Sequence, residues 1–206
     1  MLKTFINSIL AGLCIGIGGI AYLSISNPVG GAIFFCVGLF VILNFNFNLL
    51  TGKLCYTFSN NIKYFYNLFI ILLGNYIGAN IIGLSLNLTR LTSLQEKCTN
   101  IVNTKLNDSL LSIFILAILC NILIYVAVEG FKSENTLTKY LSLFFGVSVF
   151  VVCGFEHSVA DMFYFSFALN YTGRAFLVLL IVILGNFVGG NLFELTKKLF
   201  SKLENK

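Results

Sequence analysis

The stretch GNYIGAN at residues 74–80 recurs as GNFVGGN at residues 185–191. Each copy places two glycines four residues apart, a spacing that lets membrane helices pack closely. Each copy also lies in the third of three long apolar segments, so the chain divides into two halves of three segments. Because three is an odd number, we expect the halves to lie in the membrane with opposite orientations. Inverted repeats of this kind place a solute site near the midplane, between interrupted helices.

Composition identifies the class of protein. Hydrophobic residues make up 58% of the 206 residues and charged residues 10%, whereas soluble domains carry roughly 25% charged residues. Six apolar segments, each near the ~20 residues of a helical span, cover about 5–25, 29–50, 64–86, 110–128, 137–155 and 173–195. We therefore expect residues 1–206 to form a single all-α transmembrane domain of six helices in a lipid bilayer. Its basic residues are mostly scattered singly, which argues against a nucleic-acid partner.

The basic residues also predict an orientation. With the N-terminus in the cytoplasm, nine of them fall in cytoplasmic segments, and four fall outside: Arg90, Lys97, Lys105 and Arg174. An excess of lysine and arginine on the cytoplasmic side is typical of membrane proteins. We expect a multi-pass protein of the inner or plasma membrane with both termini in the cytoplasm.

Redox and metal chemistry have little support in the sequence. The six cysteines are spread evenly without a CxxC pair, and the chain has one histidine. A haem or redox subunit needs paired histidines or reactive cysteine pairs. We therefore expect no cofactor, no bound metal and no enzymatic activity.

Two interruptions fall inside the apolar segments. The run NFNFNLLTG at residues 44–52 breaks the end of the second segment, and GFEHS at residues 154–158 breaks the fifth. Non-helical backbone at membrane depth is tolerated only inside protein or along a wet cavity. We expect helices 2 and 5 to be broken and their breaks to line a pore.

The second interruption carries a family resemblance. GFEHSVADM at residues 154–162 resembles the GFEHSxANM signature of the formate/nitrite transporter family, with Asp161 in place of the usual asparagine. NLLTG at residues 48–52 is similar to that family's ELFTG or DLFTG, without its acidic first residue. Lys105 stands sixteen residues before Asn121, as does a basic residue near the outer entrance in the family. The resemblance extends over essentially the whole chain.

The resemblance implies an aquaporin-like fold, assembled as a homopentamer, with one path per protomer for a small monovalent anion such as formate, nitrite or hydrosulfide. By matching position it places on the substrate path His157, Thr51, Lys105, Asn121, Leu49 and Leu50. It makes constrictions of Phe35, Leu39 and Phe150. Support for the broken loops would come from Glu156, Ser158, Gly154 and Gly52.

His157 is the centre of the predicted pore, because an ionisable residue within a span usually marks an ion or proton path. Its ordinary pKa of ~6.5 would let it donate a proton to the anion or stabilise it as imidazolium, so passive and proton-coupled transport both stay open. We expect Lys105 and Arg174 to give the outer vestibule a positive potential, and Glu156 to brace its loop by accepting backbone amide protons. The alternative is a channel for a small neutral solute, with His157 as a hydrogen-bonding gate.

Overall fold

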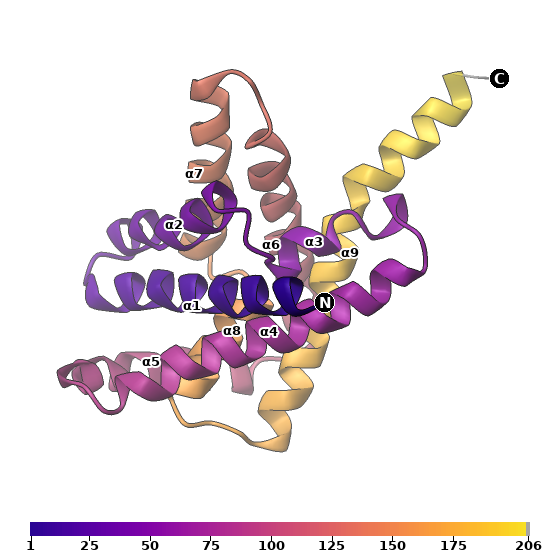
Figure 1. Ribbon diagram of the computed structural model, residues 1–206. Coiled ribbons are helices and arrows are strands. Elements are labelled where there is room, and N and C mark those ends of the chain that lie inside the picture. Colours follow the sequence, from indigo (N-terminus) through magenta and orange to yellow (C-terminus); the bar gives the residue numbers. More distant parts are fainter. Residues whose placement is uncertain (205–206) are drawn as a thin grey trace.

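The computed structural model (Figure 1) describes residues 1–204 and is all-helical over that range. The first half of the chain contains α1 (Leu2–Ser24), α2 (Pro28–Asn44), α3 (Leu50–Leu54), the short 3-10 helix η1 (Thr57–Ser59) and α4 (Lys63–Leu86). Between the halves lie η2 (Arg90–Leu94) and α5 (Gln95–Asn107). The second half contains α6 (Leu110–Gly130), α7 (Thr136–Val152), α8 (Ser158–Phe167) and α9 (Gly173–Glu204).

Within the described residues, four helices are long and apolar enough to cross a membrane: α1, α4, α6 and α9. The shorter apolar helices α2 and α7 have 17 residues each. Both stop earlier than the apolar segments that predicted them, α2 at Asn44 and α7 at Val152, because left-handed backbone follows each end, at Asn46 (φ +54°) and Gly154 (φ +67°). The all-α prediction is confirmed, whereas the count of six spans stays a prediction.

The repeated glycine motif brings helices into close contact in both halves. α1 packs most extensively against α4, and α6 packs most extensively against α9. At Gly78 of α4, an added Cβ would collide with the carbonyl of Ile9, and at Gly189 of α9 it would collide with the carbonyl of Ile118. Side chains larger than hydrogen would force these helices apart, which explains why the motif recurs.

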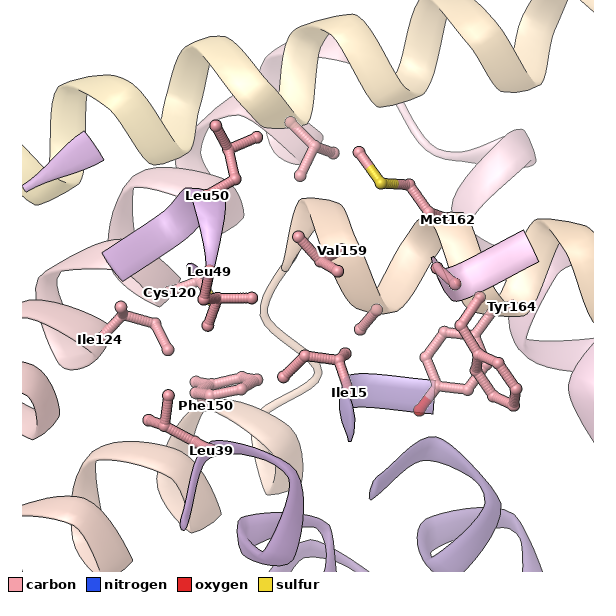
Figure 2. Close-up of a cluster of buried hydrophobic side chains, with 14 of the residues drawn as sticks. Ile15, Leu39, Leu49, Leu50, Cys120, Ile124, Phe150, Val159, Met162 and Tyr164 are labelled. Atoms are coloured by element: carbon pink, nitrogen blue, oxygen red, sulfur yellow. The ribbon is translucent and has the colours of Figure 1, made fainter. Parts of the chain in front are cut away.

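Apolar side chains lie both inside and outside this helical bundle. Figure 2 shows part of the buried cluster, in which side chains from several helices meet around the loop before α8. Large apolar side chains also point outward, as at Phe34 (60% exposed), Phe69 (55%) and Leu180 (53%). In water such a surface would be unfavourable, and in hydrocarbon it matches its surroundings. The chain is therefore a multi-pass membrane protein.

The long hydrophilic segment between the halves is structured by α5. Lys97 on this helix donates hydrogen bonds from Nζ to the carbonyls of Tyr22 (3.2 Å), Leu23 (3.0 Å) and Ile25 (2.7 Å) at the end of α1. The last carbonyls of a helix lack partners within it, so one lysine satisfies several of them. This contact fixes α5 to the first half of the chain.

Candidate functional site

The interruption before α3 is held by Asn75, the asparagine of the first repeat motif. Its Oδ1 accepts a hydrogen bond from the backbone N–H of Leu50 (2.7 Å). Its Nδ2 donates to the carbonyls of Asn48 (2.9 Å) and Ser8 (2.7 Å). A buried backbone group without a partner is costly, so this fully buried amide replaces the bonds that the helix break removes.

Asn186, the asparagine of the second motif, makes the same three kinds of bond. Its Oδ1 accepts from the N–H of Ser158 (3.0 Å), and its Nδ2 donates to the carbonyls of Glu156 and Ala117 (2.9 Å each). Glu156 and Ser158 flank His157, so this amide positions the loop that carries the histidine. Sequence reasoning assigned Asn75 and Asn186 no part in the site, although the repeat itself was the signal that could have found them.

His157 lies at the first residue before α8 and serves as its N-terminal cap. The ring Nδ1 accepts a hydrogen bond from the N–H of Ala160 (3.1 Å). The other ring nitrogen, Nε2, lies 2.9 Å from Oγ1 of Thr51 in α3. Thr51 and His157 are both buried, so the two interruptions, far apart in sequence, meet through this pair.

The cap determines which nitrogen carries the proton. In a neutral imidazole one nitrogen donates and the other accepts. Because Nδ1 accepts from Ala160, the proton of the neutral ring lies on Nε2, which then donates to Thr51. His157 in this arrangement is a hydrogen-bond donor, and a second proton on Nδ1 would break the cap of α8.

A cavity of about 210 Å³ reaches His157 from the side of α5. We call it the α5-side cavity; its polar lining includes Lys105, Glu156, His157 and Asp161, and its apolar lining includes Tyr22, Phe35, Phe150 and Tyr164. The rings of Phe35 and Phe150 meet edge to face at 6.0 Å, and Phe150 stacks on the His157 ring at 5.4 Å and 12°. Of the two phenylalanines predicted as constrictions, Phe150 therefore lies against the histidine, and Phe35 packs on Phe150 in the same cavity.

A second cavity of about 210 Å³ lies on the side of α3. This α3-side cavity is lined by Leu39, Leu49, Gly52, Lys53 and Lys132, among others. No described residue lines both cavities. Leu50 and Thr51 line neither cavity, and both are buried. The backbone N–H of Leu50 donates to Oδ1 of Asn75.

Lys105 projects from α5 to two carboxylates. Its Nζ lies 2.5 Å from Oε2 of Glu156 and 3.0 Å from Oδ1 of Asp161. All three side chains are buried, with 9%, 3% and 1% of their residue surfaces exposed. Burial alone lowers the pKa of Lys105, but the carboxylates of Asp161 and Glu156 outweigh burial and hold it above its ordinary value. The lysine therefore stays charged.

This arrangement corrects two predictions. Lys105 was expected to give the vestibule a positive potential, but two carboxylates contact its single ammonium group. The physical reason is that a buried cation is stable only when it is paired. Glu156 was expected to accept backbone amide protons, and its carboxylate accepts from Lys105 instead, while its carbonyl is held by Asn186. Arg174 donates to the carbonyls of Leu106 and Asp108 at the end of α5.

Three further residues predicted for the site, Asn121, Ser158 and Gly154, act on the backbone around the two loops. Asn121 on α6 is fully buried and donates from Nδ2 to the Thr51 carbonyl (3.1 Å), so it holds α3 rather than lining either cavity. Ser158 contributes its backbone N–H, since its hydroxyl has no hydrogen-bond partner among the described residues. Gly154 has the positive φ that the turn into the histidine loop requires, a conformation that side-chain-bearing residues rarely adopt.

Comparison with known proteins gives consistent results. The chain is 32% identical over 186 residues to the uncharacterized transporter YrhG of Bacillus subtilis, covering 82% of this chain and 70% of YrhG. It is 26% identical over 187 residues to the formate channel FocA of Escherichia coli, covering 79% of this chain and 65% of FocA, slightly less than two thirds. A solved pentameric formate channel with formate bound matches the fold with a TM-score of 0.83 at 24% identity, covering 98% of this chain and 97% of that one.

The family comparison covers most of the molecule described above. The model of the formate/nitrite transporter family matches residues 1–197, which include both interruptions, the two asparagines that hold them, and the cavities on either side. The chain therefore belongs to the formate/nitrite transporter family.

Proposed function

We propose that this protein conducts a small monovalent anion, such as formate, nitrite or hydrosulfide, across the membrane. The observation that carries the proposal is the contact between His157 and Thr51, at the meeting point of the two interruptions. An imidazole N–H and a hydroxyl are donors suited to an anion that has lost part of its hydration. Family membership and the formate channels among the similar proteins support the choice of solute.

The path would run from the α5-side cavity to the α3-side cavity through His157. Phe35 and Phe150 would form the constriction on one side of the ring, and Leu39 with Leu49 would form it on the other. Apolar side chains at a narrow point exclude hydrated ions until the side chains move. The anion would exchange water for the His157 and Thr51 donors at the centre.

The membrane arrangement belongs to the same proposal. It comprises six spans, with the second (α2, α3) and the fifth (α7, α8) interrupted, and two halves of opposite orientation. Both termini would face the cytoplasm across the inner or plasma membrane. The chain would assemble as a homopentamer with one path per protomer, which the pentameric assembly named for the structural neighbour supports.

Uptake into proteoliposomes tests the solute. We expect faster uptake of formate, nitrite or hydrosulfide than of glycerol, relative to protein-free vesicles. Because His157 also caps α8, the informative variant is His157→Asn, since asparagine is among the best capping residues. We expect it to lower anion uptake by at least about tenfold, as one lost hydrogen bond to a charged group costs ~1.5–3 kcal/mol. Glycerol uptake without anion uptake would refute the proposal and favour a neutral-solute channel.

A further inference from the structure

The α5-side cavity contains an imbalance of buried charge. Glu156 and Asp161 both contact the single ammonium group of Lys105, at 2.5 Å and 3.0 Å. If all three groups are ionised, the cluster has a net charge of −1 directly beside His157, which lines the same cavity. An anion that enters this cavity would meet a negative charge at close range, where water screens poorly.

Asp161 is the member of the cluster whose side chain has the fewest hydrogen bonds. It is 1% exposed, it lines the cavity, and neither Oδ1 nor Oδ2 accepts a hydrogen bond of good geometry from any described residue. Its ion pair with Lys105 is the longer of the two. A buried carboxylate that shares its one counter-ion with a second carboxylate is stabilised by taking up a proton. The two neighbouring carboxylates can then share that proton.

We propose that Asp161 is a proton-binding site on the translocation path, so that the α5-side cavity accepts an anion well only when this site is protonated. The proposal rests on the proposed anion transport. The proton comes from water on the α5 side and returns there, and the only bond that forms or breaks is the carboxyl O–H. As pH rises, the site loses its proton, the cluster becomes anionic, and anion uptake slows.

The titratable groups around Asp161 come from several helices. Lys105 approaches from α5, Glu156 and His157 from the preceding loop, Cys120 from α6 and Tyr164 from α8 itself. α1 contributes Tyr22 to the same cavity, and α9 contributes Arg174, which is bound to backbone carbonyls of Leu106 and Asp108. Of these, Glu156 is the second carboxylate in contact with Lys105, so it is the group with which the proton is shared.

The test compares Asp161→Asn with wild type and with Asp108→Asn. The asparagine side chain in Asp161→Asn has nearly the same shape as the aspartate and no charge. Asp108 lies on the same side of the protein, outside the cavity, and accepts from Ser109 and Ser112, so its variant removes a nearby surface charge without entering the path. Formate uptake into proteoliposomes is measured at equal pH on both sides, from roughly pH 5 to pH 8, after subtracting protein-free vesicles.

Wild type and Asp108→Asn should lose at least about tenfold in uptake rate across this range, and Asp161→Asn should lose less than about threefold. An unchanged pH profile in Asp161→Asn overturns the proposal. So does an Asp108→Asn profile as flat as that of Asp161→Asn, since surface charge would then explain the effect. Absence of formate, nitrite and hydrosulfide uptake from all three proteins at every pH would instead refute the proposed anion transport.

A second measurement does not depend on transport. The infrared C=O stretch of a protonated carboxyl should be present in purified wild-type protein near neutral pH and should disappear in Asp161→Asn. A spectrum that Asp161→Asn leaves unchanged would overturn the proposal, even if this variant were too unstable for transport assays.

Discussion

Replacement of Asn186 by leucine should strongly destabilise the protein. Leucine has a similar size but makes none of the three hydrogen bonds of the amide. Each bond contributes about 1 kcal/mol, and a buried backbone group left without a partner costs about 1–3 kcal/mol. The N–H of Ser158 and the carbonyl of Glu156 both lose a partner, so we expect the free energy of unfolding to fall by about 3 kcal/mol.

The assay is unfolding in mixed detergent micelles by titration with sodium dodecyl sulfate, followed by circular dichroism. Asn75→Leu should lose a similar amount, because Asn75 makes three matching bonds. The matched control is Asn80→Leu, at the last position of the first motif, since its amide holds no loop backbone: Nδ2 donates to the Tyr76 carbonyl within its own helix, and Oδ1 accepts from the exposed Tyr171 hydroxyl. A loss below about 1 kcal/mol in Asn186→Leu, or an equal loss in Asn80→Leu, would refute the reasoning.

Three other predictions concern Lys105, Gly189 and Thr51. Lys105→Met should lower the free energy of unfolding by about 3–5 kcal/mol in the same titration, since it leaves buried carboxylates unpaired, and added Asp161→Asn should recover part of the loss. Gly189→Ala should lower the free energy of unfolding by about 1–3 kcal/mol in that titration, because the added methyl group meets a backbone carbonyl of α6. Gly52→Ala, whose methyl group would meet only one side-chain atom at 3.4 Å, is the control and should lose less than Gly189→Ala. Thr51→Val should slow formate uptake by about tenfold while it changes stability by less than about 1.5 kcal/mol, and unaltered uptake would exclude its hydroxyl from the path.

The helices were predictable from composition because apolar length alone determines a membrane helix. α4, predicted at 64–86, runs from Lys63 to Leu86, and α6, predicted from 110, begins at Leu110. The non-helical residues 45–49 and 153–157 lie at the two predicted interruptions, where clustered asparagines and a charged motif are unfavourable in lipid, whereas the breaking of two spans stays a prediction. The family was predictable from the motif around His157, and the match over residues 1–197 confirms it.

The partners of the polar side chains were not predictable from spacing. Lys105 and Glu156 are 51 residues apart in sequence, and the surface potential expected of a basic residue disappears once a carboxylate neutralises it. Asn75 and Asn186 could equally have been packing residues, because nothing in a sequence states which backbone groups a fold leaves without partners. The helical structure of α5 was also missed, since its residues lack the apolar run that reveals a span.

The attachment of α5 at both ends restricts how the protein can move. Lys97 joins it to the end of α1 through three carbonyls, and Lys105 joins it to the loop before α8. Rocking of one repeat against the other, by which many two-repeat transporters expose a site alternately to each side, would have to break one of these attachments. Rotation of Phe35 or Phe150 about its own side-chain bonds needs no such rupture. If the proposed path exists, it would therefore open by the motion of a few aromatic rings within a rigid frame.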